Sequence, residues 1–518
     1  MARPPEKLAA SLEILKRLQD KGIIAIRSAD LPRVHRERLL KNGFLQDVMK
    51  GWYIPARPDE PAGESTAWYA SFWSFCAAYL DTRFSDAWCL SPEQSLSLHA
   101  GNHTVPRQLL VRASKARNKP TPLPFDTSLL EVRAALPTAT NVVQIGGLRL
   151  FSLPAALVAS GPAFFENQPI DARTALTLVR DGSEVLTLLL EGGHSVIAGR
   201  LAGSFRNIGR TRIADDILKT MRAAGYTVRE RDPFVRQIPL ILPQCEISPF
   251  AGRIRLMWQQ MREPVLEMIP PPPAHPNDMD VYLRQVEDVY VTDAYHSLSI
   301  EGYRVSPELI DRVRRGNWDP DANEHDREHR NALVARGYWQ AFQAVKDSLR
   351  KVLDGNNPGR VADHDHGDWY REMFAPSVTA GLLRPADLAG YRNGPVFVRR
   401  SMHLPPSPDS VRDAMPVFFE MLTNEIETAA RVVLGHFIFV YIHPYTDGNG
   451  RMGRFLMNVM LAASGYPWTV VPLGQRDAYM AALEYASAGQ DILPFASFLG
   501  KLIDDGLQGR RVAELPSE

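Results

Sequence analysis

Four consecutive prolines, Pro270 to Pro273, interrupt the chain near its middle. Proline fixes φ and lacks an amide donor, so a run of this kind forms a semi-rigid spacer rather than a helix or a central strand. The sequence that follows, from about residue 280 to 507, is strongly helical in pattern, with breaks rich in Asp, Asn and Pro near 317–325, 354–368 and 404–410. We therefore predict a Pro-rich linker over 263–279 and an all-α domain over 280–518.

Composition narrows the class of protein further. A chain of 518 residues is too long for one ordinary domain, and 45% hydrophobic with 23% charged residues is typical of globular proteins. Basic and acidic residues number 59 each, which argues against a chain that coats nucleic acid. Three cysteines, Cys76, Cys89 and Cys245, form neither a disulfide framework nor a metal motif, which predicts a reducing, cytoplasmic location. No apolar run approaches the roughly 18–20 residues that span a bilayer, so we expect no membrane partner.

Residues 1–60 have the pattern of a winged helix-turn-helix. Leucines at helical spacing predict a first helix that ends at Gly22, and Ser28 or Asp30 would cap a short second helix. A basic third helix over 32–42 would precede a hairpin from Phe44 to Ile54. In a DNA complex, its basic side chains would contact phosphates; they are Arg33, Arg36, Arg38 and Lys41. A solvated basic face, or a domain that contacts only protein, explains the same residues, and both interpretations stay open.

Residues 61–262 alternate between helical and strand-like patterns and predict a mixed α/β domain. An aromatic-rich helix is expected near 65–80, with strands near 108–111 and 142–150. This order of elements, with the stretch Leu90-Ser-Pro-Glu-Gln-Ser-Leu-Ser-Leu-His-Ala-Gly101, resembles the antitoxin half of AbiEi-type toxin–antitoxin systems over about residues 5–200. The resemblance implies a transcriptional regulator with DNA as a partner.

The chemistry is concentrated between two apolar helical stretches, in His443-Pro-Tyr-Thr-Asp-Gly-Asn-Gly-Arg-Met-Gly-Arg454. A glycine-rich turn that leads into a helix N-terminus predicts an anion site, because backbone amides converge there and the helix dipole favours negative charge. The converging amides would be those of Gly448, Asn449 and Gly450. We therefore expect phosphate groups to bind at this turn.

Charged and titratable side chains flank the predicted anion site. Arg451 and Arg454 lie about one turn apart on the second helix, so both guanidinium groups can reach bound phosphates. Asp447 is an oxygen ligand suited to Mg²⁺. The near-neutral pKa of a histidine suits His443 to act as a general base on a hydroxyl. Together these residues predict phosphoryl or nucleotidyl transfer.

The same stretch resembles the signature of the Fic family, His-x-Phe-x-Asp/Glu-Gly-Asn-Gly-Arg-x-x-Arg, with Tyr445 in place of the usual Phe. The resemblance implies an all-α domain that transfers AMP from ATP to a Ser, Thr or Tyr hydroxyl of a target protein and releases pyrophosphate. His443 would be the base and Asp447 would hold Mg²⁺. The glycine-rich turn would form the anion hole, and Arg451 and Arg454 would hold the phosphates, Arg454 the terminal one.

Two further segments fit this resemblance. Residues 390–411 are similar to the family's flap, in which a hairpin from Val396 to His403 would pair with an extended target segment. The docking residues would be Val396, Phe397 and Val398; a plain surface hairpin is the alternative. Near the C-terminus, Tyr479 is a candidate adenine contact, with core packing as the alternative.

A built-in inhibitory element is also implied. Ser297 and Glu301 are four residues apart and share a helix face, and Gly302 is suited to the C′ position that ends a helix. This pattern matches the family's inhibitory motif, Ser/Thr-x-x-x-Glu-Gly/Asn. There the glutamate pairs with the second arginine of the signature, here Arg454, and occupies the place of the γ-phosphate. An ordinary helix end with a solvated glutamate is the alternative.

Two other functions remain compatible with these residues. Relatives of the same fold move other phosphate-linked groups or remove AMP, although members that phosphorylate their targets carry Ala where this chain has Gly448. Alternatively, the chain could be a transcriptional regulator of the toxin–antitoxin type with the Fic domain as a sensor. The sequence carries no signature of an oligomeric state or of a particular target.

Overall fold

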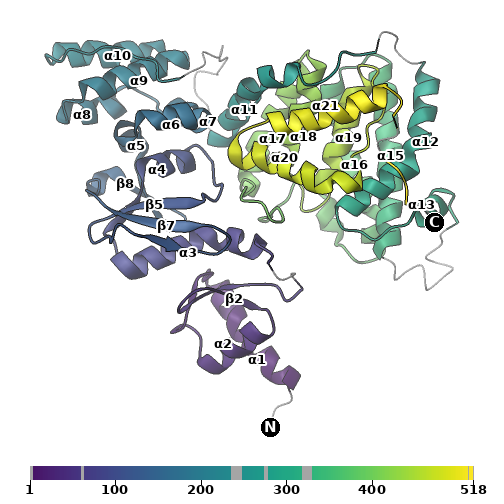
Figure 1. Ribbon diagram of the computed structural model, residues 1–518, viewed down its shortest axis with the longest axis horizontal. Helices are drawn as coiled ribbons and strands as arrows, with labels where there is room; N and C mark the ends of the chain where they lie inside the picture. Colours follow the sequence, from purple (N-terminus) through teal and green to yellow (C-terminus); the bar gives the residue numbers. More distant parts are fainter. Residues whose placement is uncertain are drawn as a thin grey trace. The chain divides into compact units, whose positions relative to one another are not determined.

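The computed structural model describes residues 4–59, 63–234, 248–273, 278–317, 330–510 and 513–516. They form two compact units, one of Met1–Arg253 with Phe397–Leu404, the other of Ile254–Val396 with Pro405–Glu518 (Figure 1). Helix α11 (Pro249–Leu266) extends into the region predicted as a linker, whereas residues 270–273 have no regular secondary structure. The finer division into four domains stays a prediction.

The first 59 residues form two helices and a small antiparallel sheet. Helix α1 (Pro4–Asp20) and helix α2 (Arg33–Lys41) accompany strands β1 (Ile26–Arg27), β2 (Leu45–Met49) and β3 (Trp52–Pro55), in the order β1-β3-β2. Apolar side chains from each of these elements meet in one small core that includes Leu15, Leu39 and Leu45.

The second helix predicted for this region is wrong, and the winged-helix arrangement is not confirmed. Residues 26–30 join the sheet instead: Ile26 and Arg27 pair with β3, and the Ser28 amide donates to the Gly51 carbonyl at 2.9 Å. Asp30 accepts hydrogen bonds from the backbone and guanidinium of Arg27, which closes a turn rather than capping a helix.

The rest of the first unit is mixed α/β, as predicted. A four-stranded sheet has the order β4-β5-β7-β6, with β5 and β7 parallel and the other pairs antiparallel. Its elements are α3 (Thr66–Phe84), β4 (Trp88–Leu90), α4 (Pro92–His99), β5 (Gln108–Ala113), β6 (Pro120–Pro122) and β7 (Ser128–Arg133). The aromatic side chains of α3, among them Trp68, Phe72 and Phe75, belong to the core.

A hairpin and a group of short helices complete this unit. The hairpin consists of β8 (Val142–Ile145) and β9 (Leu148–Phe151). The helices are α5 (Leu153–Ala159), α6 (Pro162–Asn167), α7 (Pro169–Thr177), α8 (Ser183–Glu191), α9 (Ser195–Asn207) and α10 (Thr211–Ala223). With Cys89 of β4 and Leu96 of α4 they bury a second apolar cluster, whose other members run from Phe151 to Phe234 in the sequence.

The second unit is all-α over its described residues, which confirms the prediction for this part of the chain. Figure 1 shows its helices gathered around α18 (Thr428–Ile442) and α19 (Asn449–Ala462), and nearly every side chain of these two is buried. The surrounding helices are α12 (Met279–Ile300), α13 (Pro307–Arg314), α15 (Arg330–Leu353), α16 (Pro358–Thr379), α17 (Pro408–Asn424), α20 (Arg476–Gly489) and α21 (Leu493–Leu507). The candidate site therefore lies on the loop between two largely buried helices of this unit.

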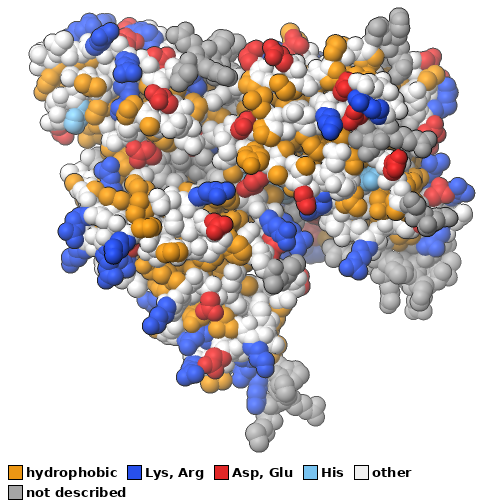
Figure 2. Space-filling model, viewed as in Figure 1, with side chains coloured by type: hydrophobic (Ala, Val, Ile, Leu, Met, Phe, Trp, Pro, Cys, Tyr) orange, Lys and Arg blue, Asp and Glu red, His pale blue; other side chains and the backbone are white. Residues whose placement is uncertain are grey.

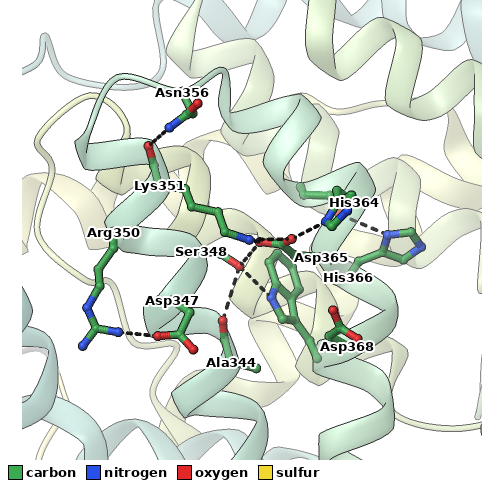
Figure 3. Close-up of polar contacts among 12 residues, drawn as sticks. Ala344, Asp347, Ser348, Arg350, Lys351, Asn356, His364, Asp365, His366 and Asp368 are labelled. Atoms are coloured by element: carbon green, nitrogen blue, oxygen red, sulfur yellow. Dashed lines mark hydrogen bonds and ion pairs between the residues drawn. The ribbon is translucent and has the colours of Figure 1, made fainter.

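A buried polar network joins α15 to α16 (Figure 3). The carboxylate of Asp365 accepts hydrogen bonds from Ser348 Oγ and Lys351 Nζ, each at 2.7 Å, and Trp369 Nε1 donates to Ser348 Oγ at 3.0 Å. Burial alone would raise the pKa of Asp365, but hydrogen bonds from Lys351, Ser348 and His364 hold it below its usual value. The network fixes α16, whose next turns carry aromatic side chains beneath the candidate site.

The surface is mixed in charge. Figure 2 shows basic and acidic side chains interspersed over the visible face, as the balanced composition leads one to expect. Among the described helices, none combines the length and the apolar character needed to cross a bilayer.

Candidate active site

The loop between α18 and α19 is set by two left-handed residues. His443 ends α18 with φ 53° and ψ 60°, and the following Pro444 disfavours any helical continuation. Gly448, with φ 83°, turns the chain into α19. Asn449 closes the loop from inside, because its Oδ1 accepts from the Tyr445 amide at 2.9 Å and its Nδ2 donates to the Tyr445 carbonyl at 2.8 Å.

Aromatic side chains support this loop from beneath. Tyr445 is 1% exposed and stacks on Tyr370 of α16, with ring centroids 3.9 Å apart and planes 8° apart. Tyr391 and Phe439 contact the same ring at tilted angles. Burial raises the pKa of Tyr445 well above the usual value, so it stays a neutral packing residue. Tyr therefore occupies the position where the signature usually has Phe.

The imidazole of His443 is neutral and has one defined tautomer. Nδ1 lies 3.1 Å from the Val440 carbonyl oxygen, which can only accept, so Nδ1 carries the hydrogen. Burial lowers the pKa of His443 to about 4, and the Val440 carbonyl offsets only part of this shift. At neutral pH, Nε2 therefore presents a lone pair that can accept a proton from a hydroxyl.

Asp447 is the carboxylate of the loop. Its side chain is 58% exposed, and it accepts from the Gly448 amide at 2.6 Å, from Arg451 Nη2 at 3.1 Å and from the Tyr303 hydroxyl at 3.3 Å. Partial loss of water around the carboxylate would raise the pKa of Asp447, but the charge of Arg451 and these hydrogen bonds hold the pKa below its usual value, so Asp447 is ionised.

The residues present fit a Mg²⁺ ion whose other ligands would be water and phosphate oxygens. Mg²⁺ in such sites takes one or two carboxylates, with water and phosphate oxygens as the other ligands. Asp447 supplies one ionised carboxylate beside the helix N-terminus. Within the described part of the chain, no group of three or more metal-ligating side chains is present, so a closed all-protein cage is absent there.

Both signature arginines are buried and point toward the N-terminal turn of α19. The Arg451 guanidinium lies over the rings of Phe374 and Tyr303 at 5.2 and 5.3 Å, and within the described part of the chain its Nε has no hydrogen-bond partner. Arg454 is 3% exposed, and its Nη1 has no hydrogen-bond partner among the residues that the structure describes. Buried guanidinium donors without partners beside a helix N-terminus are suited to bind phosphate oxygens.

The end of α12 occupies part of this anion site. Arg454 Nε donates to Ser297 Oγ at 3.0 Å, and Nη2 donates to Glu301 Oε1 at 2.7 Å. Gly302 follows with φ 89°, the left-handed conformation of a C′ residue. The structure thus contains the ion pair between Glu301 and Arg454 that the motif predicts, across 153 residues of sequence. A Cβ at Gly450 would collide with Glu301 Oε1, so the carboxylate lies directly against the glycine-rich turn.

The sequence around this loop is similar to a known protein family. Residues 366–461, which include the loop and both arginines, match the sequence model of the Fic/DOC family. The C-terminal part of the chain contains a Fic domain.

Curated relatives are similar to 42% of the chain. The protein adenylyltransferase Fic of Drosophila willistoni is 30% identical over 220 residues, which are 42% of this chain and 40% of the relative. The protein of the same name from Nematostella vectensis is 38% identical over 225 residues, 42% of this chain and 48% of the relative. The match therefore spans less than half the length of these relatives. Among solved structures, a fragment of Fic-1 from C. elegans is similar to this chain. The match covers 63% of this chain and 92% of the fragment, with 19% identity and a TM-score of 0.37.

The segment predicted as the flap of the Fic domain is not a hairpin. Residues 396–403 form no strands; a turn is closed where the Ser401 amide donates to the Val398 carbonyl at 3.2 Å. The backbone pairs elsewhere, because the Arg400 amide donates to Thr66 Oγ1 and the Met402 carbonyl accepts from the Val105 amide. The predicted hairpin is therefore wrong.

The docking residues predicted on this segment are divided between the two units. Val396 belongs to the unit that contains the Fic domain, whereas Phe397 and Val398 belong to the first unit, and Phe397 is 45% exposed. Within the first unit, Arg399 and Arg400 pair with Glu64 at 3.0 and 3.3 Å. Docking of a target on this segment stays a prediction.

Tyr479 lies in the core. Its side chain is 1% exposed, its hydroxyl is 2.8 Å from His436 Nε2, and it packs against Phe495 and Phe498. Core packing, rather than contact with adenine, describes this residue.

The four basic residues predicted to contact DNA lie on or at the end of α2, but two of them are engaged within their own domain. Arg36 donates to the Ser28 carbonyl at 3.1 Å, and Arg38 donates to the Lys7 carbonyl at 2.7 Å. Arg33 is exposed and pairs with Glu37 on the same helix, and Lys41 is exposed. Phosphate contacts by Arg36 and Arg38 would therefore require them to leave these partners.

Sequence reasoning missed several residues that shape the site. Tyr303 contacts both Asp447 and Arg451, and its signal was its place directly after the Glu301-Gly302 pair. Tyr391 contacts the ring of Tyr445, and Arg392 donates to the His443 carbonyl, so both hold the loop between α18 and α19. Their signal was the Tyr391-Arg392 dipeptide, which lies in the segment predicted as the flap, just before the predicted hairpin.

Proposed function

We propose that the chain transfers AMP from ATP to a hydroxyl group of a protein target. The observation that carries this proposal is the neutral His443, with Nε2 as the proton acceptor, beside a glycine-rich helix N-terminus with two buried arginines. The curated relatives named protein adenylyltransferase support the same reaction class.

The reaction follows from the donors and acceptors of the loop. His443 Nε2 takes the proton of the target hydroxyl as its oxygen attacks the α-phosphorus of ATP. The new phosphorus–oxygen bond forms as the bond to the β-phosphate oxygen breaks, and pyrophosphate leaves. Backbone amides at the start of α19 and the guanidinium groups of Arg451 and Arg454 stabilise the phosphate charge. Mg²⁺ held by Asp447 would neutralise phosphate charge when bound.

In the described arrangement, Glu301 restrains this activity. Its carboxylate engages Arg454 and lies against Gly450, where it takes the place that an anionic phosphate group would otherwise occupy. ATP that binds to this arrangement cannot make the full contact between its terminal phosphate and Arg454. We therefore expect the native chain to label targets slowly.

The test uses three forms of the full chain: the native chain, Glu301→Gly, and Glu301→Gly combined with His443→Ala. Each is incubated with Mg²⁺, cell lysate and ATP labelled at the α-phosphate, and the labelling of protein is compared. Glu301→Gly should label itself or lysate proteins well above the native level, because Arg454 becomes available to phosphate. Glu301→Gly combined with His443→Ala should lose labelling by about 10²–10⁴-fold, the usual contribution of a general base.

Labelling with ATP that carries the label on the γ-phosphate serves as the control for the group transferred. AMP transfer places no label from this nucleotide on protein, whereas phosphorylation does. The proposal is wrong if Glu301→Gly labels nothing from α-labelled ATP, or if the double variant labels as fast as Glu301→Gly.

A further inference from the structure

One buried arginine outside the signature contacts the catalytic loop. Arg392 is 3% exposed, and its Nε donates to the His443 carbonyl at 2.8 Å while its backbone amide donates to the Pro444 carbonyl at 3.0 Å. Nη1 donates to the Gly394 carbonyl at 3.1 Å, and Nη2 donates to the Pro406 carbonyl. The guanidinium therefore joins three segments: the loop at His443 and both ends of the segment from 394 to 406.

The partners of this cation are carbonyl oxygens rather than a carboxylate. A buried charge is costly and is ordinarily met by an opposite charge. Burial lowers the pKa of Arg392 to about 10, and the nearby charge of Arg412 acts in the same direction, yet Arg392 remains cationic at neutral pH. The planar fork of the guanidinium suits this place because it can direct several donors at fixed angles.

The backbone of Arg392 is fixed from its other side. The hydroxyl of Tyr391 is 3.0 Å from His366 Nε2 on α16. His366 Nδ1 lies 2.8 Å from the Asp363 carbonyl, so it carries the hydrogen and Nε2 accepts from Tyr391. Helix α16 therefore holds Tyr391, and Arg392 extends from this fixed point to the catalytic loop.

His443 needs such an anchor because of its conformation. A residue with a side chain is strained in the left-handed region, and it persists there only where its surroundings hold it. The hydrogen bond from Arg392 acts on the carbonyl of His443 itself, while the amide of Arg392 holds the next carbonyl. Without these bonds, the loop could relax and move Nε2 away from the reacting hydroxyl.

We propose that Arg392 is a positioning residue for the transfer reaction, which orients His443 and ties the ends of the segment from 394 to 406 to the same point. This inference rests on the proposed function. Arg392 does not touch the anion site in the structure, so it acts through His443 and not through ATP.

The experiment uses the full chain with Glu301→Gly as the parent. Self-labelling from α-labelled ATP and Mg²⁺ is measured over a range of ATP concentrations, which separates the maximal rate from the half-saturating concentration. Arg392→Met should lower the maximal rate on the order of 10²-fold, the cost of a displacement of about 1 Å in a catalytic group. The half-saturating ATP concentration should stay within about twofold, because the contacts to phosphate are unchanged.

Two further variants complete the design. Arg412→Met removes an arginine of the same neighbourhood that donates to Asn393 and to the Pro408 carbonyl but not to the catalytic loop, and it should retain the parent rate. Arg392→Lys keeps the charge and one donor group and should recover part of the rate. If Arg392→Met does not fold, the same measurement on Arg392→Lys tests the proposal. We then expect a loss of about tenfold in maximal rate with an unchanged half-saturating ATP concentration.

The outcomes are distinguishable from a failure of the proposed function. If the Glu301→Gly parent itself labels nothing, the proposed function is wrong. If the parent labels but the Arg392 variants match it, or lose ATP affinity in parallel with rate, the positioning role of Arg392 is wrong while the proposed function stands.

Discussion

At the scale of single residues, the site depends on one histidine whose two ring nitrogens have different tasks. Nδ1 is occupied by the Val440 carbonyl, so only Nε2 can accept a proton. The left-handed backbone of His443 directs the ring, and Arg392 holds that backbone. A histidine with a lowered pKa is a weaker base, but all of it is in the reactive neutral form at neutral pH.

This arrangement predicts how the labelling rate depends on pH. Because the pKa of His443 is lowered to about 4, the imidazole stays neutral above that value, and the rate of Glu301→Gly should not fall as pH drops through about 6.5, the ordinary histidine pKa. Loss of rate should begin only below about pH 5. The charge of Glu301 raises the pKa of His443, so its removal shifts this limit lower still. The measurement is the initial rate of self-labelling at saturating ATP from about pH 4.5 to 8. A tenfold loss per pH unit starting near 6.5 would contradict it.

At the scale of elements, the site is assembled from helices that are far apart in the sequence. The end of α12 supplies Ser297 and Glu301, and the start of α19 supplies the anion site. Helix α16 lies beneath the loop and contributes Tyr370 and Phe374. The position of α16 in turn depends on its polar network with α15.

We expect Asp365→Asn to destabilise this helix pair. The substitution removes the carboxylate that accepts from Ser348 and Lys351, at a cost of about 1–3 kcal/mol for a buried hydrogen-bonded group. The pKa of Asp365 lies below its usual value in the folded state, so this contribution is present above the unfolded pKa and is lost as pH falls through the folded value. Denaturant unfolding of the native chain and Asp365→Asn at pH 7 measures the first effect, and the difference between the two chains should shrink as the pH is lowered step by step through the acidic range.

Asp368→Asn is the matched control, because Asp368 lies on the same helix (Figure 3) but is 56% exposed and pairs with the exposed Arg371. Exposed pairs contribute about 0–1 kcal/mol, so this variant should stay close to native. Equal destabilisation by both substitutions would show that the buried network has no special role.

At the scale of the whole molecule, the sequence predicted local features far better than contacts between distant segments. Spacing within the signature indicated a turn and a helix N-terminus, because those depend on neighbouring residues. The pair of Glu301 with Arg454 came from family resemblance and not from spacing. The predicted flap hairpin was wrong because the backbone of Arg400 pairs with Thr66, more than 300 residues away in sequence. Arg392 was missed for the same reason, because its partner carbonyl at His443 is 51 residues away. Every residue has a backbone carbonyl, so the sequence does not indicate which one accepts a hydrogen bond.

The interplay between Glu301 and nucleotide predicts a change in the thermal stability of the full chain. A ligand that binds only the folded state stabilises it by RT ln(1 + [L]/Kd). Release of Arg454 from Glu301 should add a charge-assisted contact to the terminal phosphate, worth about 1.5–3 kcal/mol. We therefore expect ATP with Mg²⁺ to bind Glu301→Gly at least about tenfold more tightly than the native chain. Calorimetry should show a larger ATP-dependent rise in Tm for the variant.

ADP provides the control, because it lacks the γ-phosphate that Arg454 would contact. The ADP-dependent rise in Tm should be similar for the native chain and Glu301→Gly, whereas the ATP-dependent rise should differ. Arg454→Ala added to Glu301→Gly should abolish the difference between the two nucleotides, since the guanidinium that pairs with Glu301 in the structure is the one proposed to contact the terminal phosphate. If ATP and ADP raise the Tm of Glu301→Gly equally while Arg454 is intact, the carboxylate of Glu301 does not occupy the place of the terminal phosphate. The restraint on activity would then have to act on His443 or Asp447 instead.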